Sequence, residues 1–364
     1  MQHRERSNAS RPGISGMKRI SRGTFLKRTA ALSALAASPA LLASCGGSPA
    51  SSGSPEGSGE SGGAITLTLD WYPNADHAGV YMARSLGLFD DAGLDVEIQQ
   101  PSDPASVLQL VAAGRSEFGI SYETEMTNAA VRDIPVVSVM AIMQHPLNSL
   151  MNLRKTDISD PADLAGRKVG YAGGQSLGSA VLDTVLREAG EDSASVEKIN
   201  VGYDLRPALT SGRVDAIVDA YWNIEAVELE REGFEVEVIR LEDVGVPNYN
   251  ELVVATASDY AETNPRVVRD FVAALVAGHE AATDDPEAAS QALIEASPEL
   301  DEETARRTTQ LTVPIFRESG CPVGFQPPDE WREYVSWSVE NEVLPRSIEV
   351  DRVVTNEYLP EGER

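Results

Sequence analysis

The stretch ITLTLDWYPNADHAGVYMARSLGLF, residues 65–89, decides the fold. Its first five residues alternate between apolar and polar side chains, which predicts a strand over residues 65–69. Asn74 can cap a helix, and the apolar pattern that follows continues to a stop near Gly87, so a helix is predicted there. A strand that leads directly into a helix is the building unit of α/β proteins.

Strand–helix units of this kind recur along the chain. Further strands are predicted at residues 94–98, 118–121, 168–171 and 216–219, with helices at 105–113, 179–188 and 224–232. Beyond about residue 255 the pattern predicts helices at 265–283, 286–296, 301–317 and 329–342. The alternation predicts parallel sheets that are covered by helices.

Two segments of the chain resemble each other. Residues 113–120 and 211–217 each contain a glycine that can end a helix with positive φ, followed by an Arg-x-acid turn into a strand. Their separation of about a hundred residues suggests two similarly built lobes. A chance match of so common a helix ending explains the resemblance equally well. The expected architecture is two α/β lobes with additional helical packing.

The charge of the chain is acidic and unevenly distributed. Its 364 residues include 30 Lys and Arg against 57 Asp and Glu, a net charge of −27. Residues 1–44 hold eight basic groups and one acid, so they carry +7 and the remainder carries −34. So acidic a body repels phosphate backbones and anionic lipid headgroups, which argues against nucleic-acid binding.

Residues 1–44 are predicted to be a signal peptide. Basic residues precede an apolar run at 30–42 that is too short to span a bilayer. The run leads into Leu-Ala-Ser-Cys45, which resembles the bacterial lipoprotein box and predicts lipid attachment at Cys45; a plain cleaved signal is the alternative. Gly23 replaces the second Arg of a twin-arginine-like run, which leaves Sec or Tat export open. The Gly-, Ser-, Pro- and Glu-rich residues 45–63 predict a flexible tether.

Neither a disulfide nor a metal site is expected. Cys321 is the only cysteine besides Cys45, so lipidation of Cys45 leaves no cysteine pair. The four histidines are scattered without the spacing of metal ligands, which argues against a zinc site.

One motif is typical of hydrolases. Residues 174–178, GQSLG, match the G-x-S-x-G nucleophile elbow. The only later histidine, His279, lies in a helical pattern, whereas a triad histidine usually lies on a loop. The alternative is that Gly173, Gly174 and Ser176 form a helix N-terminus whose amides face a polar ligand.

Aromatic and polar side chains cluster at four predicted strand ends. The clusters are Trp71 to Gly79, Tyr171, Tyr221 to Glu225 and Asn248 to Glu251. Open α/β sheets bind ligands at the carboxyl ends of their strands. Each cluster alone is common in ordinary cores and surfaces, but the four together predict a flat, polar heteroaromatic ligand that stacks on the rings.

The same clusters carry a family resemblance. The motifs Trp-x-Pro-Asn-x-x-His-x-Gly at 71–79, Tyr-Trp-Asn-x-Glu at 221–225 and Tyr-Asn-Glu-Leu at 249–252 resemble the substrate-binding proteins of thiamine-precursor ABC importers. Those proteins bind a formylaminopyrimidine and share a fold with the fungal-type thiamine pyrimidine synthase. The resemblance extends over about residues 64–360.

The resemblance implies an α/β, type II periplasmic-binding-protein fold, with two α/β lobes and a ligand cleft between them. Lobe 1 is expected from residues 64–150 and 253–364, the second part including the C-terminal helices, and lobe 2 from residues 151–252. The implied ligand-binding residues are Trp71, Asn74, His77, Tyr122, Tyr171, Gly173, Gly174, Ser176, Tyr221, Trp222, Asn223, Glu225 and Glu251.

Roles for these residues follow from the same resemblance. Trp71 with Tyr171 or Trp222 sandwiches the pyrimidine, while Asn74, Asn223 and Glu225 bond its edge. Structural alternatives remain for three of them: His77 can be a residue of the first helical turn, Trp222 can pack under the hinge, and Glu225 can cap its own helix.

The synthase branch of the superfamily departs from this sequence. A synthase needs a lysine for pyridoxal phosphate and a histidine one turn later, but alignment on Gly119 places Ser121 and Glu125 there. Its cysteine-rich stretch is also missing around residues 246–250. We therefore expect a protein without catalysis, cofactor or metal.

The expected function is that of a lipid-anchored receptor on the extracytoplasmic face of the cell membrane. It passes a thiamine-pathway pyrimidine to an ABC permease and its ATPase by hinge closure. The alternatives are a receptor for another flat vitamin such as riboflavin, a pyrimidine synthase and, last, a hydrolase.

Overall fold

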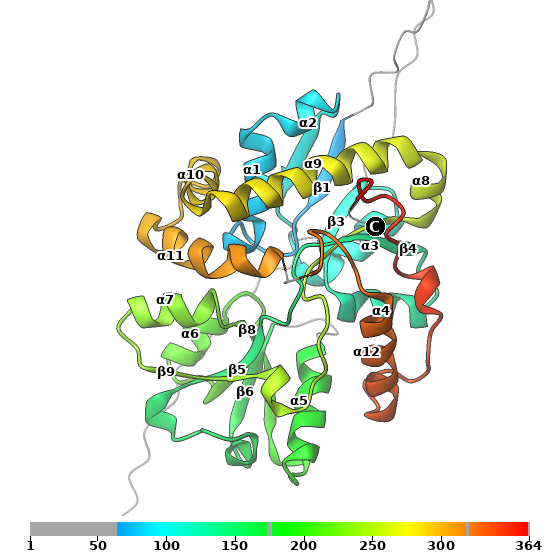
Figure 1. The fold of residues 1–364 in the computed structure, drawn as a ribbon. Helices are drawn as coiled ribbons and strands as arrows, with labels where there is room; N and C mark the ends of the chain where they lie inside the picture. The colour runs from blue at the N-terminus through cyan, green and yellow to red at the C-terminus, as the bar shows by residue number, and fades with distance from the viewer. Residues whose placement is uncertain (1–63, 173–176, 318–319, 363–364) are drawn as a thin grey trace, which may run out of the picture. The chain divides into compact units, whose positions relative to one another are not determined.

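The computed structural model describes residues 64–172, 177–317 and 320–362. Within these residues the chain forms two five-stranded sheets (Figure 1). The first sheet has the order β2-β1-β3-β10-β4 and the second has the order β7-β6-β8-β5-β9. The strands of the first are β1 (Ile65–Thr68), β2 (Val96–Gln99), β3 (Phe118–Ser121), β4 (Val136–Ala141) and β10 (Val253–Ala257). Those of the second are β5 (Asn148–Leu153), β6 (Lys168–Tyr171), β7 (Glu197–Asn200), β8 (Ala216–Tyr221) and β9 (Val236–Arg240).

Both sheets are mixed, so the prediction of parallel sheets is only partly right. Strands β2, β1 and β3 run parallel, as do β7, β6 and β8. Strand β10 is antiparallel to β3 and β4, and β5 is antiparallel to β8 and β9. The sequence pattern revealed only strand–helix–strand units, whose crossovers produce parallel pairs. Strands β5 and β10 instead enter their sheets after the chain has crossed from the other sheet.

The first sheet is covered on both faces. Helices α1 and α9 cover one face, where Leu67 and Phe118 pack against Phe271. Helices α3, α4 and α12 cover the other face, where Val253 packs in a cluster with Trp331. The bounds of these helices are α1 (Ala78–Ser85), α3 (Val107–Ala112), α4 (Glu123–Val131), α9 (Pro265–Asp284) and α12 (Pro328–Glu340).

Helices α1 and α9 approach each other closely because small residues face each other at their contact. A Cβ atom on Gly278 of α9 would lie 2.5 Å from the carbonyl oxygen of Gly79 in α1. Glycine is therefore required at residue 278 for the two backbones to reach this separation.

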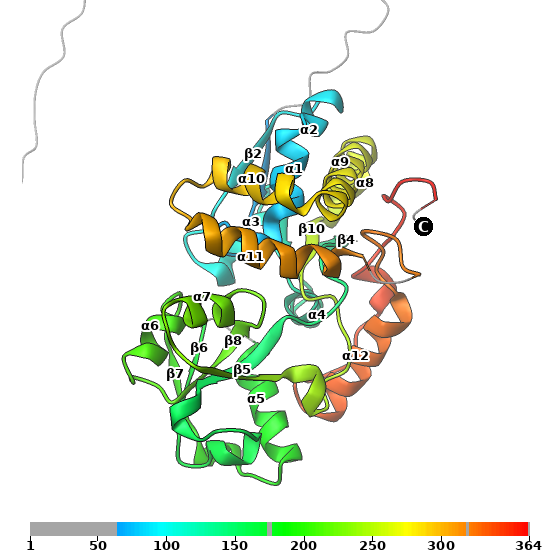
Figure 2. The same cartoon turned by 60° about the vertical axis from the view of Figure 1, so that its left-hand side comes forward.

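The second sheet is also covered on both faces (Figure 2). Helix α5 (Leu177–Glu188) packs Leu182 and Leu186 against Val169 and Val218. On the opposite face, helices α6 and α7 contribute Leu209 and Leu229. The bounds of these two helices are α6 (Leu205–Thr210) and α7 (Glu225–Arg231).

The remaining helices are α2 (Leu88–Asp91), α8 (Ser258–Thr263), α10 (Pro286–Ala296) and α11 (Glu302–Thr312). The helix predicted at 286–296 is confirmed, whereas that at 301–317 is shorter. Helix α11 gives way to a 3₁₀ turn at Val313–Phe316, where Pro314 has no amide proton to continue the helix. None of the helices in the described residues is both long and apolar enough to cross a membrane.

We call the first sheet with α1–α4 and α8–α12 the first lobe, and the second sheet with α5–α7 the second lobe. The chain passes between them twice, at residues 142–147 and 241–252, which we call the crossing segments. The predicted boundary at residue 150 lies inside β5, and the one at residue 252 directly precedes β10.

Candidate functional site

A pocket lies where strand ends of the two lobes meet the crossing segments. It encloses about 1240 Å³ of empty space, counting the part open to solvent. The first lobe contributes side chains from the ends of β1 and β3, and the second lobe contributes side chains from β8 and α7. This position at the carboxyl ends of strands is where open α/β sheets bind ligands. Its polar and aromatic lining includes Asp70, Trp71, Asn74, Ser121, Tyr122, Glu125, Asn128, Asn148, Asp219, Tyr221, Glu225, Tyr249 and Glu251.

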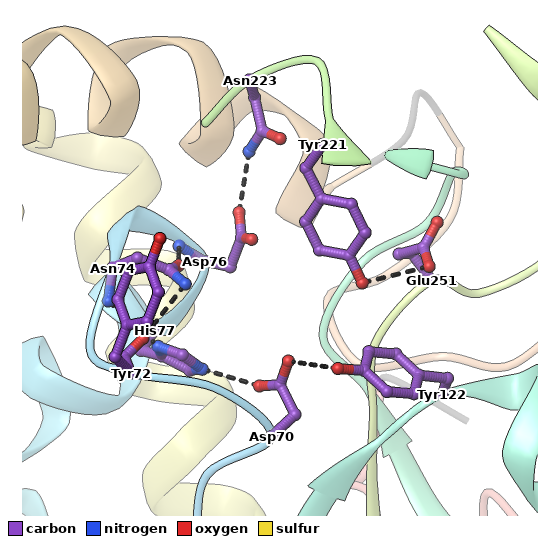
Figure 3. A network of polar contacts seen from close by, with 9 residues as sticks. All are labelled: Asp70, Tyr72, Asn74, Asp76, His77, Tyr122, Tyr221, Asn223 and Glu251. Atoms are coloured by element: carbon purple, nitrogen blue, oxygen red, sulfur yellow. Dashed lines mark hydrogen bonds and ion pairs between the residues drawn. The ribbon is translucent and has the colours of Figure 1, made fainter. Parts of the chain in front are cut away.

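Asp70, which follows β1, is bonded by side chains on both of its oxygens (Figure 3). Its Oδ1 lies 2.8 Å from His77 Nε2, and its Oδ2 accepts a hydrogen bond of 2.8 Å from the Tyr122 hydroxyl. Burial, together with the Asp70 charge, raises the pKa of Tyr122 well above its ordinary value, so this hydroxyl stays a donor.

Asn74 lines the pocket but is also a capping residue, as its sequence position indicated. Its Oδ1 accepts a hydrogen bond from the Asp76 amide, and its Nδ2 donates to the carbonyl of Tyr72. His77 completes the capping box, because its Nδ1 accepts from the Asn74 amide at 3.2 Å. His77 is fully buried and is not among the pocket-lining residues. The structure therefore gives His77 a structural role in the first helical turn, which is the alternative that the sequence left open.

Glu251 ties the two crossing segments together. Its Oε2 accepts hydrogen bonds from the amides of Leu147 and Asn148 and from the Tyr249 hydroxyl. Its Oε1 accepts a fourth from the Tyr221 hydroxyl at 3.2 Å. Burial raises its pKa to about 7. Glu251 lines the pocket, and its hydrogen bonds fix the backbone at the point where the lobes join.

Glu225 and Tyr221 face the pocket from the second lobe. Glu225 is the first residue of α7, and its Oε2 accepts a hydrogen bond of 2.7 Å from the Tyr221 amide. Burial and the neighbouring Glu228 raise the pKa of Glu225 above its ordinary value. The backbone contact is a structural role, and the predicted contact with a ligand edge stays a prediction.

Asn223 joins the two lobes and is not among the pocket-lining residues. Its Nδ2 donates to Asp76 Oδ1 and to Thr312 Oγ1, both at 2.7 Å, and its side chain is fully buried. Burial raises the pKa of Asp76 well above its ordinary value. The structure thus gives the Asn223 amide protein partners in place of the predicted ligand edge.

The predicted aromatic residues fall into two groups. Trp71 lines the pocket, and the centre of its ring lies 4.2 Å from the centre of the Tyr203 ring. Trp222 and Tyr171 are not among the lining residues. The Arg240 guanidinium lies 4.1 Å from the centre of the Trp222 ring, whose Nε1 donates to a crossing-segment carbonyl. Trp222 thus packs against Arg240 and a crossing segment, which is a structural role of the kind that the sequence left open for it.

Four predicted site residues lie outside the part of the chain that the structure describes. They are Gly173, Gly174 and Ser176 of the glycine-rich segment and the lipid-attachment residue Cys45.

Among the pocket residues that sequence reasoning missed are Asp70, Glu125, Asn148 and Asp219. Asp219 adopts a positive φ of 64°, which is uncommon outside glycine, and its Oδ2 accepts from the amide of Ala172. Burial raises the pKa of Glu125 to about 7. The signal that could have revealed Asp70 is its place directly before Trp71, at the end of a strand.

Ser121 and Glu125, at the two positions where a synthase requires lysine and histidine, both line the pocket. The lysines of the described residues are Lys155, Lys168 and Lys198, and none of them lines it. The pocket therefore does not fit pyridoxal phosphate held through an imine. Across residues 64–172, 177–317 and 320–362, no group of three or more His, Cys, Asp and Glu is placed to hold a metal ion.

Comparison with solved structures shows the fold. The alkanesulfonate-binding protein from Xanthomonas axonopodis aligns with a TM-score of 0.64 at 15% identity, covering 82% of this chain and 99% of that one. The predicted periplasmic-binding fold of two α/β lobes is confirmed.

Sequence comparison shows the family. The chain is 35% identical to the formylaminopyrimidine-binding protein of Halalkalibacterium halodurans over 75% of this chain and 84% of that protein. It is 24% identical to the 4-amino-5-hydroxymethyl-2-methylpyrimidine phosphate synthase of Legionella pneumophila, over 82% and 92% of the two chains. The model of the NMT1/THI5-like family matches residues 74–289. The chain therefore belongs to the NMT1/THI5-like family.

Proposed function

We propose that this protein is the extracytoplasmic receptor of an ABC importer and that its ligand is a pyrimidine precursor of thiamine. One observation carries the proposal: a single pocket receives Trp71 from the first lobe and Tyr221 and Glu225 from the second. Ligand sites of this kind combine apolar and aromatic surfaces with a few polar groups that set orientation. The relative that is named for binding formylaminopyrimidine supports this choice of ligand.

Hinge closure is the proposed mechanism. A ligand that contacts both lobes binds better when the lobes are closed, so it shifts the population toward the closed state. The crossing segments are the connections that absorb such a rotation, and Glu251 holds them together. The permease and its ATPase then act on the closed, loaded receptor.

Two alternative functions compete with the proposed pyrimidine receptor. A receptor for another flat vitamin such as riboflavin fits the same aromatic and polar lining. A pyrimidine synthase is disfavoured because Ser121 and Glu125 occupy the positions of its lysine and histidine. Without a lysine in the pocket there is no amine to anchor an aldehyde cofactor.

A binding experiment tests the receptor. Titration calorimetry with 4-amino-5-hydroxymethyl-2-methylpyrimidine, its formylamino derivative and riboflavin should show binding of a pyrimidine. Trp71→Ala should weaken that binding by roughly 1–3 kcal/mol, the cost of losing one stacked ring. Trp222→Ala is the matched variant: equal losses would mean that Trp222 also stacks on the ligand, as the sequence predicted. A folded protein that binds none of the pyrimidines would contradict the proposed function.

We also propose that Cys45 carries the lipid anchor. The lipoprotein-box sequence before it supports this, and residues 45–63 then form the tether. Cys45→Ala should release the protein from the membrane fraction, whereas Cys321→Ala, the matched control, should stay bound. If the Cys45 variant stays in the membrane fraction after a high-salt wash, the lipid anchor at Cys45 is refuted, and the proposed binding function is unaffected.

A further inference from the structure

We propose that Asp70 is the carboxylate that accepts a hydrogen bond from the ligand's exocyclic amine, and that His77 and Tyr122 position it. This inference deepens the proposed function and rests on it. It assigns a specificity-determining role to Asp70, which the family motifs did not indicate.

Asp70 lies in the wall of the pocket. It follows β1, immediately precedes Trp71, and lines the pocket although only 3% of its surface is exposed. A carboxylate this deeply buried is costly unless hydrogen bonds replace the lost water. Asp70 and Trp71 line the same pocket, so the edge of a ring that stacks on Trp71 lies within the space that Asp70 borders.

Both side-chain partners of Asp70 donate a hydrogen bond to it. The Asn74 amide donates to His77 Nδ1 at 3.2 Å, so Nδ1 carries no proton in this tautomer. The proton is therefore on Nε2, which donates to Asp70 Oδ1, while Tyr122 donates to Oδ2. A carboxylate oxygen accepts about two hydrogen bonds, so each oxygen of Asp70 retains capacity for a ligand donor.

Asp70 differs from three other pocket carboxyls, those of Glu251, Glu225 and Asp219. Glu251 accepts from two backbone amides, Glu225 from the Tyr221 amide and Asp219 from the Ala172 amide, so each of them fixes local backbone. Within the described part of the chain, no backbone amide donates to Asp70; its two partners are both side chains, from different elements. The network around Asp70 thus orients the carboxylate itself, as the supporting residues of a binding site do (Figure 3).

This arrangement selects a chemical class of ligand. A fixed acceptor beside an aromatic ring favours a heteroaromatic ring that carries an amino group. It disfavours the same ring with an acceptor at that position, because two acceptors then face each other in a buried site. The selection is therefore between amino and oxo or hydroxy forms of one ring.

The test compares two ligands against matched variants. Calorimetry uses 4-amino-5-hydroxymethyl-2-methylpyrimidine and its 4-hydroxy analogue. The proteins are wild type, Asp70→Asn, Tyr122→Phe, Glu225→Gln and, as control, Asp259→Asn on the exposed start of α8. Asp70→Asn should lose roughly 10- to 100-fold in affinity for the amino ligand and little for the hydroxy analogue. Tyr122→Phe should lose roughly 3- to 10-fold and reduce the ratio between the two ligands in the same direction. The control should match wild type.

Each outcome separates the claims. If Asp70→Asn keeps the wild-type preference for the amino ligand, or if Glu225→Gln abolishes that preference and Asp70→Asn does not, the role of Asp70 is refuted and the receptor function stands. If wild type binds no aminopyrimidine, the proposed function and this inference both fail. Melting temperatures identify a misfolded Asp70 variant, and Tyr122→Phe, which keeps its ring, then decides by its ligand ratio alone.

Discussion

The two lobes share one plan. Each sheet contains three parallel strands, β2-β1-β3 and β7-β6-β8, followed by one antiparallel strand that arrives from the other lobe. The resemblance between residues 113–120 and 211–217 is part of this plan. Gly114 and Gly212 both have positive φ, at 63° and 73°. Glu117 accepts from the Thr66 amide and Asp215 from the Lys168 amide, so each acid ties its strand to the neighbouring parallel strand.

The lobes differ in what they present at equivalent strand ends. After β1 the first lobe presents the side chains of Asp70, Trp71 and Asn74. After β6 the second lobe presents Ala172, whose amide is bonded by Asp219. The first lobe also has more helices on one face of its sheet, because α9 and α10 pack on α1 (Figure 1). The comparison teaches that equivalent strand ends can differ: one presents polar and aromatic side chains to the pocket, and the other presents a small residue whose amide is bonded within the protein.

The largest expected effect on stability concerns the contact between α1 and α9 in the first lobe. Gly278→Ala places a Cβ atom 2.5 Å from the Gly79 carbonyl, so α1 and α9 must separate. We expect a loss of about 3 kcal/mol in the free energy of unfolding, at the upper end of overpacking costs. Chemical denaturation measures it. The matched change in the second lobe is Gly170→Ala, whose Cβ meets only methyl groups, at 3.3–3.4 Å. Equal losses of unfolding free energy in the two variants would contradict this difference in packing between the lobes.

The shared turn offers an intermediate effect. Glu117→Ala removes the acceptor of the partly buried Thr66 amide and should cost about 1–2 kcal/mol in the free energy of unfolding. Asp215→Ala removes the equivalent acceptor at an exposed amide, which water can satisfy, so about 0.5 kcal/mol is expected. Denaturant titration of both variants checks the order. A larger loss of unfolding free energy in Asp215→Ala than in Glu117→Ala would contradict this order.

The smallest expected effect is the pH dependence of stability. Burial raises the pKa of Glu125 in the first lobe and of Glu251 in a crossing segment to about 7, and raises that of Glu225 in the second lobe. An acid whose pKa is higher in the folded state stabilises the protein below its unfolded pKa, and this stabilisation is lost as the pH rises through the folded pKa. The melting temperature should therefore fall between pH 6.5 and 8.5.

The expected fall is roughly 2–4 °C, the shift that about 1 kcal/mol produces in domains of 150–250 residues. Calorimetric scans of wild type and Glu125→Gln measure it, and the variant should show a shallower fall. His279, whose pKa burial lowers to about 4, stays neutral throughout this window and does not contribute. A melting temperature that rises over the same window would contradict the buried, protonated state of these carboxyls.

Much of the fold was predictable from local sequence patterns. The strands at 168–171 and 118–121, the helix at 286–296 and the two glycine-ended turns follow from residue periodicity and capping, which act over a few residues. Strand β5 was not predicted, because a fully buried strand carries no alternating pattern, and every residue of β5 is buried.

The candidate site was predictable to a smaller extent. Of the residues that the resemblance implied, Trp71, Asn74, Tyr122, Tyr221, Glu225 and Glu251 line the pocket, while His77, Tyr171, Trp222 and Asn223 do not. A motif shows which residue types stand at a strand end. It does not show whether a side chain turns to the pocket, to its own backbone or to the other lobe.

The sequence by itself determined the strand–helix alternation and the aromatic residues at strand ends, because short-range spacing encodes both of them. Tertiary structure decided which polar groups meet. Asp70 and Tyr122 are 52 residues apart and Asp76 and Asn223 are 147 apart, yet each pair is hydrogen-bonded. Such pairs depend on how the sheets and helices pack, and burial then turns those contacts into raised pKa values and a fixed acceptor in the pocket.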